Sequence, residues 1–171
     1  MTFASLEQQK AAALARVDAW SPARLAYRPG PPAWSAVEVL DHVEKVERQI
    51  LVAVQHGLSQ PHRIGVRDRL GFLFLDRLFQ SDRRVKVPTS AATVLPDVYV
   101  DLVAVRQRWN TTRQDLAHLL TRFPPDSRSL GVFRHPVSGW LSMPQVLRFF
   151  SVHLHHHTFQ LTHLTNASDG L

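Results

Sequence analysis

Apolar residues recur every three or four positions along four stretches of this chain, which is the spacing of amphipathic helices that bury one face. The stretches predicted to be helical are residues 5–19, 35–55, 93–122 and 142–164. No stretch alternates between apolar and polar residues over the length of a strand, and no internal repeat is present. The pattern therefore predicts an all-α fold, a four-helix bundle whose inward faces can build a metal site.

Two of these helices have a recognisable start. Ser35 is followed three residues later by Glu38, and Ser142 by Gln145, and each pair is a capping box in which the two residues bond each other's backbone N–H groups. Residues 134–140, just ahead of the last helix, are predicted to form a loop.

The connection between the second and third helices differs from the others in length and composition. Between residues 58 and 88, a compact apolar group at 72–79 is surrounded by glycines and cationic residues. This composition predicts a short extra helix inside a long crossover.

Two histidines interrupt the apolar stripe of the last helix. The stripe consists of Val146, Phe150, His153, His157, Leu161 and Leu164. Because residues four apart share a helix face, His153 and His157 are predicted to face the core, whereas His155 points away. A buried polar group without a partner costs roughly 1–3 kcal/mol, and a shared metal ion would supply that partner.

The second helix offers a third histidine at an equivalent position. Its stripe consists of Val39, His42, Val46, Gln49 and Ala53. Three histidines on two facing helices would leave coordination positions open, as in catalytic rather than structural metal sites. The chain has no cysteine, so its metal ligands are imidazole or oxygen, and imidazole accepts zinc, nickel, iron and copper alike.

Several polar residues near these histidines allow two interpretations. His156 lies about 100° from His157 around the helix, so we expect it to support the site or an interface rather than to bind metal. Gln160 either orients a histidine or is a surface amide, and His135 is expected to face solvent. Three acidic residues lie close to His42 in the sequence: Glu38, Asp41 and Glu44. We expect them to be surface charges, and the alternative is that they orient the metal ligands. Three tryptophans are expected to anchor the core or a loop rather than to contact a substrate: Trp34, Trp109 and Trp140.

Composition limits the remaining possibilities. A chain of 171 residues with 44% hydrophobic content is predicted to form one domain, residues 1–171. No run approaches the roughly 18–20 apolar residues of a membrane span, and no signal peptide is recognisable, so a cytoplasmic protein without membrane contact is expected. Neither a nucleophilic-serine turn nor a phosphate-binding glycine loop is present.

The net charge of +6 raises the question of an anionic partner. The basic residues are dispersed along the chain, and only residues 63–86 are dense in them. We therefore expect a small-molecule substrate and no nucleic acid, with nucleic-acid binding through 63–86 as an alternative that requires strongly salt-dependent affinity.

The residues singled out above also form a family pattern. The chain resembles the DinB-like (YfiT-like) superfamily in the pair Trp34-Ser35 followed by His42, in the loop 135–139, and in the terminal pattern His-x-x-His-His-x-x-Gln at His153, His156, His157 and Gln160. The resemblance covers nearly the whole chain and implies a four-helix bundle that is often a homodimer.

The resemblance also implies a chemistry. Carried over by motif position, the ligands of a divalent metal are His42, His153 and His157, with zinc or nickel expected first and iron or manganese as alternatives. The implied activity is metal-dependent transfer of a low-molecular-weight thiol to a small electrophile, with hydrolysis as a second reaction. A non-catalytic metal- or ligand-binding module, or a dimeric interaction protein, is the alternative, and no catalytic residue is predicted beyond the metal ligands.

Overall fold

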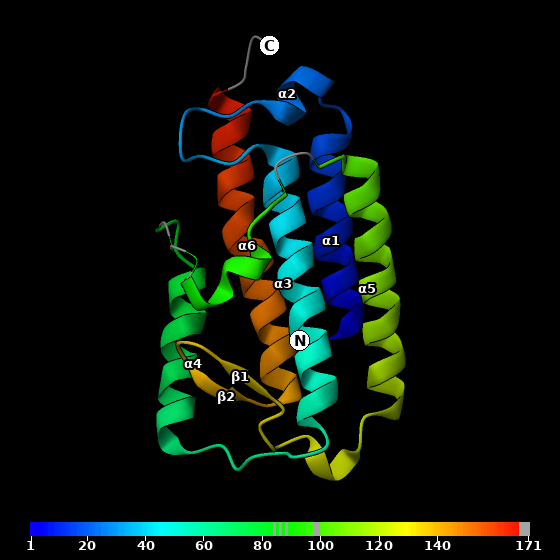
Figure 1. Cartoon of the computed structure of the whole chain (residues 1–171), viewed down its shortest axis with the longest axis vertical. Helices are drawn as coiled ribbons and strands as arrows, with labels where there is room; N and C mark the ends of the chain where they lie inside the picture. Colours follow the sequence, from blue (N-terminus) through cyan, green and yellow to red (C-terminus); the bar gives the residue numbers. More distant parts are fainter. Residues whose placement is uncertain (84, 86, 88, 98–99, 168–171) are drawn as a thin grey trace.

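Four long helices stand side by side in the computed structural model, which describes all residues except 84, 86, 88, 98–99 and 168–171 (Figure 1). They are α1 (Phe3–Asp18), α3 (Ala36–Gly57), α5 (Leu102–Arg122) and α6 (Met143–Ala167). The helix α3 packs against α5 and α6, and α1 packs against the same two helices. The four helices therefore enclose a common core, as the periodicity predicts.

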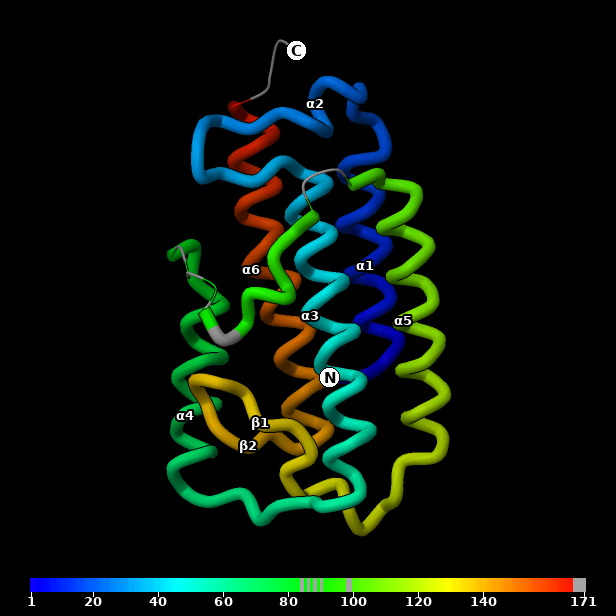
Figure 2. The backbone as a smooth tube through the Cα atoms, viewed as in Figure 1, coloured from blue at the N-terminus to red at the C-terminus, as the bar shows by residue number. Residues whose placement is uncertain are grey.

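The elements outside the four long helices lie at the ends and along one side of the bundle. The short helix α2 (Pro22–Ala26) follows α1, and the crossover helix α4 (Val66–Phe79) packs along α6 (Figure 2). A 3₁₀ segment, η1 (Thr89–Val94), returns the chain across α3, and a second, η2 (Pro125–Ser127), follows α5. The extra helix predicted in the crossover is α4.

The predicted capping boxes begin α3 and α6, with one difference. In α3, Ser35 Oγ accepts the Glu38 N–H at 3.4 Å and the Ser35 N–H donates to Glu38 Oε2 at 2.8 Å. In α6, the Ser142 N–H donates to Gln145 Oε1 at 2.9 Å, while the Ser142 hydroxyl also donates to that oxygen at 3.0 Å. The glutamine half of the second box is therefore formed, and the serine hydroxyl is used differently.

The predicted loop 134–140 is instead an antiparallel hairpin of two short strands, β1 (Phe133–His135) and β2 (Gly139–Leu141). Three residues are too few for alternation to be recognised in a sequence. Gly139 has a positive φ of 81°, which favours glycine at this turn. The hairpin packs on α4, where a Cβ on Gly71 would lie 2.7 Å from the Ser138 carbonyl oxygen. The loop prediction was therefore wrong at this point, whereas the predicted all-α class of fold is confirmed by the helical bundle.

Helix α5 begins later than predicted. Residues 89–94 form η1, and α5 starts after Asp101, whose Oδ2 accepts the Ala104 N–H at 3.2 Å. Pro96 lies between the two elements and cannot continue a helix from residue 93. Val98, an apolar position of the predicted stripe, lies outside the described residues.

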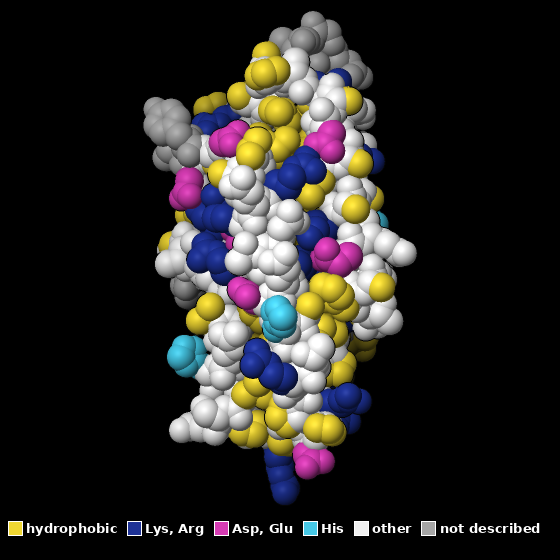
Figure 3. All heavy atoms as spheres, turned by 90° about the vertical axis from the view of Figure 1, so that its right-hand side faces the viewer, with side chains coloured by type: hydrophobic (Ala, Val, Ile, Leu, Met, Phe, Trp, Pro, Cys, Tyr) yellow, Lys and Arg dark blue, Asp and Glu magenta, His cyan; other side chains and the backbone are white. Residues whose placement is uncertain are grey.

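The surface on the α5 side of the bundle carries intermixed charges. Basic and acidic side chains alternate over this face with apolar and neutral ones, and neither sign gathers into a single patch (Figure 3). Helices of sufficient length and hydropathy to cross a membrane do not occur in the described part of the chain.

Candidate metal centre

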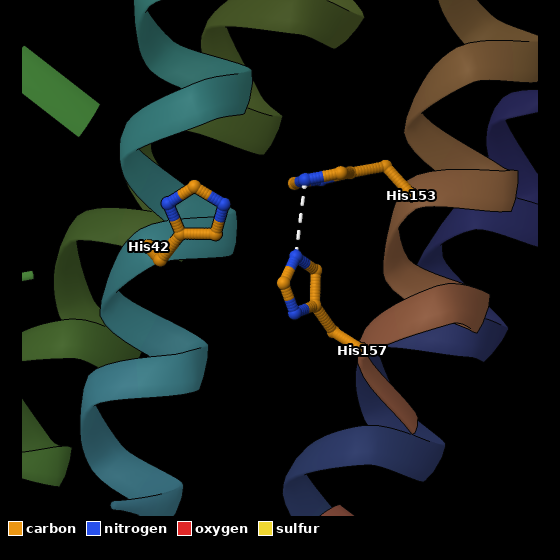
Figure 4. A group of neighbouring side chains, drawn as sticks. All are labelled: His42, His153 and His157. Atoms are coloured by element: carbon orange, nitrogen blue, oxygen red, sulfur yellow. Dashed lines mark hydrogen bonds between the residues drawn. The ribbon is translucent and has the colours of Figure 1, made fainter. Parts of the chain in front are cut away.

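Three histidines meet inside the bundle. His42 projects from α3, and His153 and His157 project from successive turns of α6 toward it (Figure 4). Their side chains are buried, and one ring nitrogen from each lies within 4.8 Å of the other two. The structure thus brings together the three residues that the stripe pattern selects.

The nitrogen spacing resembles that of a metal site. His153 Nε2 and His157 Nε2 are 3.1 Å apart. Two imidazole nitrogens that bind one tetrahedral zinc at 2.0–2.1 Å are separated by about 3.3 Å. These two imidazoles are therefore already spaced for a shared ion, and His42 faces them from the opposite helix.

Hydrogen bonds decide which nitrogen of two of these histidines is available. His42 Nδ1 lies 2.7 Å from the Val94 carbonyl oxygen, and His157 Nδ1 lies 2.9 Å from Gln160 Oε1. Since both acceptors are oxygens, each Nδ1 carries the proton and each Nε2 keeps its lone pair. Orientation of metal-binding histidines by outer acceptors is common in metalloproteins, and here a backbone carbonyl and an amide provide it.

Burial keeps the three imidazoles neutral. Loss of solvent lowers the pKa of His42 below its ordinary value of 6.5 and lowers the pKa of His153 and of His157 well below it. A neutral imidazole is the form that binds a metal. His153 Nδ1 is also buried with no hydrogen-bond partner among the described residues, so this site is not fully satisfied by the protein alone.

A cavity of about 310 Å³ opens beside the three histidines. Most of its lining is apolar, including Val46, Ile50, Leu75, Val85, Val87 and Val137. The walls come from α3, α4, α6, the crossover and the hairpin. The cavity is large enough for a small organic molecule and gives such a molecule access to the histidines.

Aromatic rings surround the histidines. Phe149 stacks on His153 with ring centroids 5.3 Å apart, and Phe79 contacts the same imidazole edge-on at 5.4 Å. Trp34 lies 4.9 Å from the His42 ring. These rings limit how the imidazoles can turn and remove water from around them.

The remaining histidines of the cluster in α6 have other partners. His156 Nδ1 lies 3.0 Å from the Ser81 carbonyl oxygen, and its ring lies beside Phe79, at the edge of the cavity. His155 is exposed. Of the two interpretations of Gln160, the structure supports the one in which it orients an imidazole, that of His157.

Two expectations for residues near the site were wrong. His135 was expected to face solvent, but it lines the cavity, because the hairpin directs its side chain inward. Trp34 was expected to be an anchor only, but it also lines the cavity. Trp109 is a core anchor as expected, and Trp140 is a partly buried anchor that stacks on His62 at 3.8 Å.

The acidic residues beside His42 are not surface charges. Asp41 and Glu44 are fully buried and face α5, where Asp41 pairs with Arg108 and Glu44 accepts the Thr112 hydroxyl at 3.0 Å. Glu38 is also buried. Its two oxygens accept hydrogen bonds from Arg28, one of them at 2.8 Å from Nε. None of the three carboxylates hydrogen-bonds His42, so their negative charges serve other contacts.

Two contributors to the site carried no recognisable signal in the sequence. The Val94 carbonyl is a backbone group, and its approach to His42 depends on how η1 folds back over α3. The valines of the crossover, Val85 and Val87, lie far from the histidines in sequence. Phe149, by contrast, precedes His153 by four residues, and helical spacing alone places the two rings on one face.

The basic side chains of α4 lie apart from this centre, although apolar residues of the same crossover line the cavity. Arg67, Arg69 and Arg77 are exposed on α4, and none of them lines the cavity. Lys86, at the end of the cationic stretch, lies outside the described residues. The absence of nucleic-acid binding stays a prediction.

Comparison with known proteins supports the family resemblance. Residues 5–161 match the DinB superfamily, and the chain belongs to it. No curated protein and no solved structure matches the chain significantly.

Proposed function

We propose that this DinB superfamily protein is a divalent-metal-dependent enzyme that transfers a low-molecular-weight thiol to a small electrophile, with His42, His153 and His157 as the metal ligands. The observation that supports it best is the convergence of three neutral imidazoles at the wall of a largely apolar cavity. A site that only stabilises the fold is usually closed by a fourth protein ligand. Among the described residues, the group of candidate ligands has three members.

The donor set favours a borderline metal. Three imidazoles suit zinc or nickel, with iron or manganese as further candidates, whereas calcium and magnesium prefer oxygen ligands. A divalent ion in this position would lower the pKa of a thiol or water molecule bound to it and so supply a nucleophile at neutral pH. Thiol transfer is proposed over hydrolysis because of the chain's family resemblance, since fold and ligands do not decide between them.

The chain's own residues prepare the site for this chemistry. Gln160 and the Val94 carbonyl hold the tautomers of His157 and His42, so no proton needs to move on those two rings before an ion binds. His153 differs, because its Nε2 donates to His157 Nε2, and that proton must move to Nδ1 of the same ring before Nε2 can bind an ion. The apolar walls limit contact with bulk water, which would strengthen the attraction between a bound ion and a thiolate.

The test measures bound metal and turnover together. Elemental mass spectrometry of the tag-free protein, reconstituted with zinc or nickel, is expected to give about one ion per chain. His42→Ala, His153→Ala and His157→Ala should lose it, and the exposed His155→Ala should keep it. Folded protein that takes up no metal would contradict the proposal.

Activity is the second half of the test. The metal-loaded protein is supplied with a small thiol and 1-chloro-2,4-dinitrobenzene, and transfer is followed by absorbance. Transfer that requires the metal supports the enzyme. One bound ion with no transfer to any of a panel of electrophiles would favour the alternative, a metal- or ligand-binding module. We also propose a homodimer, which sedimentation equilibrium tests directly.

A further inference from the structure

His135 lies in strand β1 on the side that faces the cavity. Successive residues of a strand point to opposite sides, so Phe133 and His135 share one side and Arg134 takes the other. Phe133 and His135 are partly buried, whereas Arg134 is exposed. The strand therefore turns the His135 imidazole toward its partly buried side, while the exposed Arg134 also borders the cavity.

The hairpin that carries His135 is held in place from α4. Gly71 brings the α4 backbone against Ser138, and Asp68 Oδ1 accepts the Trp140 N–H at 3.1 Å. Two backbone hydrogen bonds, from Gly65 and Trp140, lower the pKa of Asp68, so this acceptor stays ionised over a wide range. The imidazole is thus mounted on a braced turn rather than on a free loop.

The backbone of the same turn fixes the tautomer of His135. The N–H groups of Val137 and Ser138 lie 3.2 and 3.3 Å from His135 Nδ1, and both are donors. Nδ1 must accept, so the proton is carried by Nε2. Burial lowers the pKa of His135 to about 4, so the ring is neutral at physiological pH and Nε2–H is a donor without charge.

That donor has no acceptor in the described part of the chain. Among the described residues, no hydrogen bond is formed by His135 Nε2, and the atom is not among those sealed from solvent. The ring lies 5.1 Å from Phe149, and Phe149 in turn stacks on His153. One phenyl ring therefore separates the unused donor from the three-histidine centre, and all of these groups line the same cavity.

We propose that His135 forms an oxygen-binding subsite, in which its Nε2–H donates to the carbonyl oxygen of an apolar ligand whose reactive end faces His42, His153 and His157. The ligand class is an uncharged ketone, aldehyde or quinone. An uncharged ligand fits the largely apolar lining of the cavity, although Arg134 also borders it. This inference deepens the proposed function, since it specifies the electrophile, but the subsite itself needs no metal.

The experiment compares two probes of nearly equal shape in the metal-free protein, acetophenone and ethylbenzene, of which only the first has an oxygen acceptor. Acetophenone is expected to bind roughly 3- to 10-fold more tightly, as one neutral hydrogen bond would give. Its carbonyl stretching band should shift to lower wavenumber on binding. Calorimetry and difference infrared spectroscopy measure the two effects.

The decisive variant is His135→Asn. An asparagine oxygen accepts the N–H two residues ahead, so it can keep the turn while losing the Nε2 donor. The variant should keep wild-type affinity for ethylbenzene and lose both the preference for acetophenone and the infrared shift. His155→Asn, which changes an exposed histidine, should behave as wild type.

The proposal is overturned if His135→Asn keeps the preference or if the wild-type protein binds both probes equally or not at all. Nitrogen-15 spectra that place the proton on His135 Nδ1 would also overturn it. Because no metal is used, failure here leaves the metal test above unaffected. Failure of the metal test, conversely, does not change the outcome of this one.

Discussion

Helix α3 contributes to two clusters of buried polar side chains, one of charged residues that faces α5 and one of histidines that faces α6. Neighbouring residues, Asp41 and His42, belong to different clusters, and the clusters differ in how their polar atoms are paired. Asp41 faces α5 and His42 faces α6, and both are almost completely inaccessible to solvent. On the Asp41 side, charges of opposite sign fill the space between the helices. On the His42 side, three neutral rings leave a cavity and unused nitrogen atoms.

The charged side is satisfied by the protein itself. Glu47 accepts hydrogen bonds from Arg113 at 2.7 and 2.6 Å and from Trp109 at 2.7 Å. Among the described residues, three atoms of this group lack a hydrogen bond: Glu7 Oε1, Glu44 Oε2 and Arg113 Nη1. Each nevertheless faces an opposite charge, because Arg113 Nη1 lies 3.6 Å from Glu7 Oε1 and Arg108 Nε lies 3.5 Å from Glu44 Oε2. Burial of polar groups alone does not mark a functional site, because here it marks a structural one.

The histidine side differs in what remains unpaired. Burial lowers the pKa of its imidazoles, and no carboxylate hydrogen-bonds them to oppose this effect. On the other side, burial raises the pKa of Glu47, but the Arg113 guanidinium acts in the opposite direction. The comparison teaches that buried polar atoms without a hydrogen-bond partner, next to a cavity, distinguish a candidate functional site from a structural one.

The largest effect is expected from breaking the charged side. Arg113→Met would leave Glu47 buried without its counter-charge and should destabilise the protein by about 3–5 kcal/mol, measured by urea unfolding. Arg48→Met, which removes a half-exposed partner of Glu44, should cost at most about 1 kcal/mol. Equal losses in the two variants would show that the Glu47 pair does not differ from a surface pair.

The histidine side should dominate the pH dependence of the metal-free protein. The folded-state pKa values of His42, His135, His153, His156 and His157 are lowered, so below about pH 6.5 the unfolded chain binds more protons than the folded one. Stability should therefore be full above pH 7 and fall as the pH drops toward 4. Each histidine contributes at most about 1.4 kcal/mol per pH unit.

The measurement is urea unfolding at pH 7, 6 and 5 without metal. Asp97, whose pKa is lowered by Lys45, works in the same direction, but its contribution is lost only near its ordinary value of 3.8 and below. A midpoint that stays constant from pH 7 to 5 would contradict the assignment of neutral, desolvated histidines.

A smaller effect is expected from the acceptor behind His157. Gln160→Met keeps the size of the side chain but removes the oxygen that holds the Nδ1 proton. Zinc affinity should fall about 10- to 100-fold, as found when outer acceptors are removed, and competition with a chromogenic chelator measures it. Gln145→Met, which alters an amide of the same helix away from the histidines, is the matched control. Unchanged affinity in Gln160→Met would mean that the hydrogen bond does not orient the ligand.

The smallest effect is expected from one neutral hydrogen bond on the charged side. Thr112→Val removes the hydroxyl that donates to Glu44 Oε1 and should cost about 1 kcal/mol in thermal or urea unfolding. Zinc affinity should not change, since α5 supplies no candidate ligand. A loss of metal binding in this variant would show that the two sides of α3 are coupled.

The sequence predicted one side of α3 far better than the other. The pair His153 and His157 could be recognised because helical spacing puts both into an apolar stripe, and His42 because it interrupts a second stripe. The burial of Asp41 could not be recognised in the same way. Its partner Arg108 is 67 residues away, and a carboxylate in a sequence looks the same whether solvent or a guanidinium satisfies it.

Hydrophobic periodicity could not predict how the hairpin and the 3₁₀ segment contribute to the site, for another reason. The inward direction of His135 follows from a three-residue strand, and the contact of Val94 with His42 follows from a backbone carbonyl in a 3₁₀ segment. Neither has a side-chain pattern that repeats. Local geometry of this kind is decided by tertiary packing, so the four-helix core could be predicted while the cavity walls could not.

The bundle supplies the three histidines, whereas the connection between α4 and α5 supplies one wall of the cavity, and this separation has an evolutionary consequence. The three histidines lie on helices whose packing also stabilises the fold, so substitutions there would affect both stability and the metal centre. Val85, Val87 and Ala91, which form one wall of the cavity, belong to a connection that can change in length and composition at much lower cost. Related proteins could therefore diversify the molecules they accept by exchanging this one segment, while inheriting the reactive centre intact.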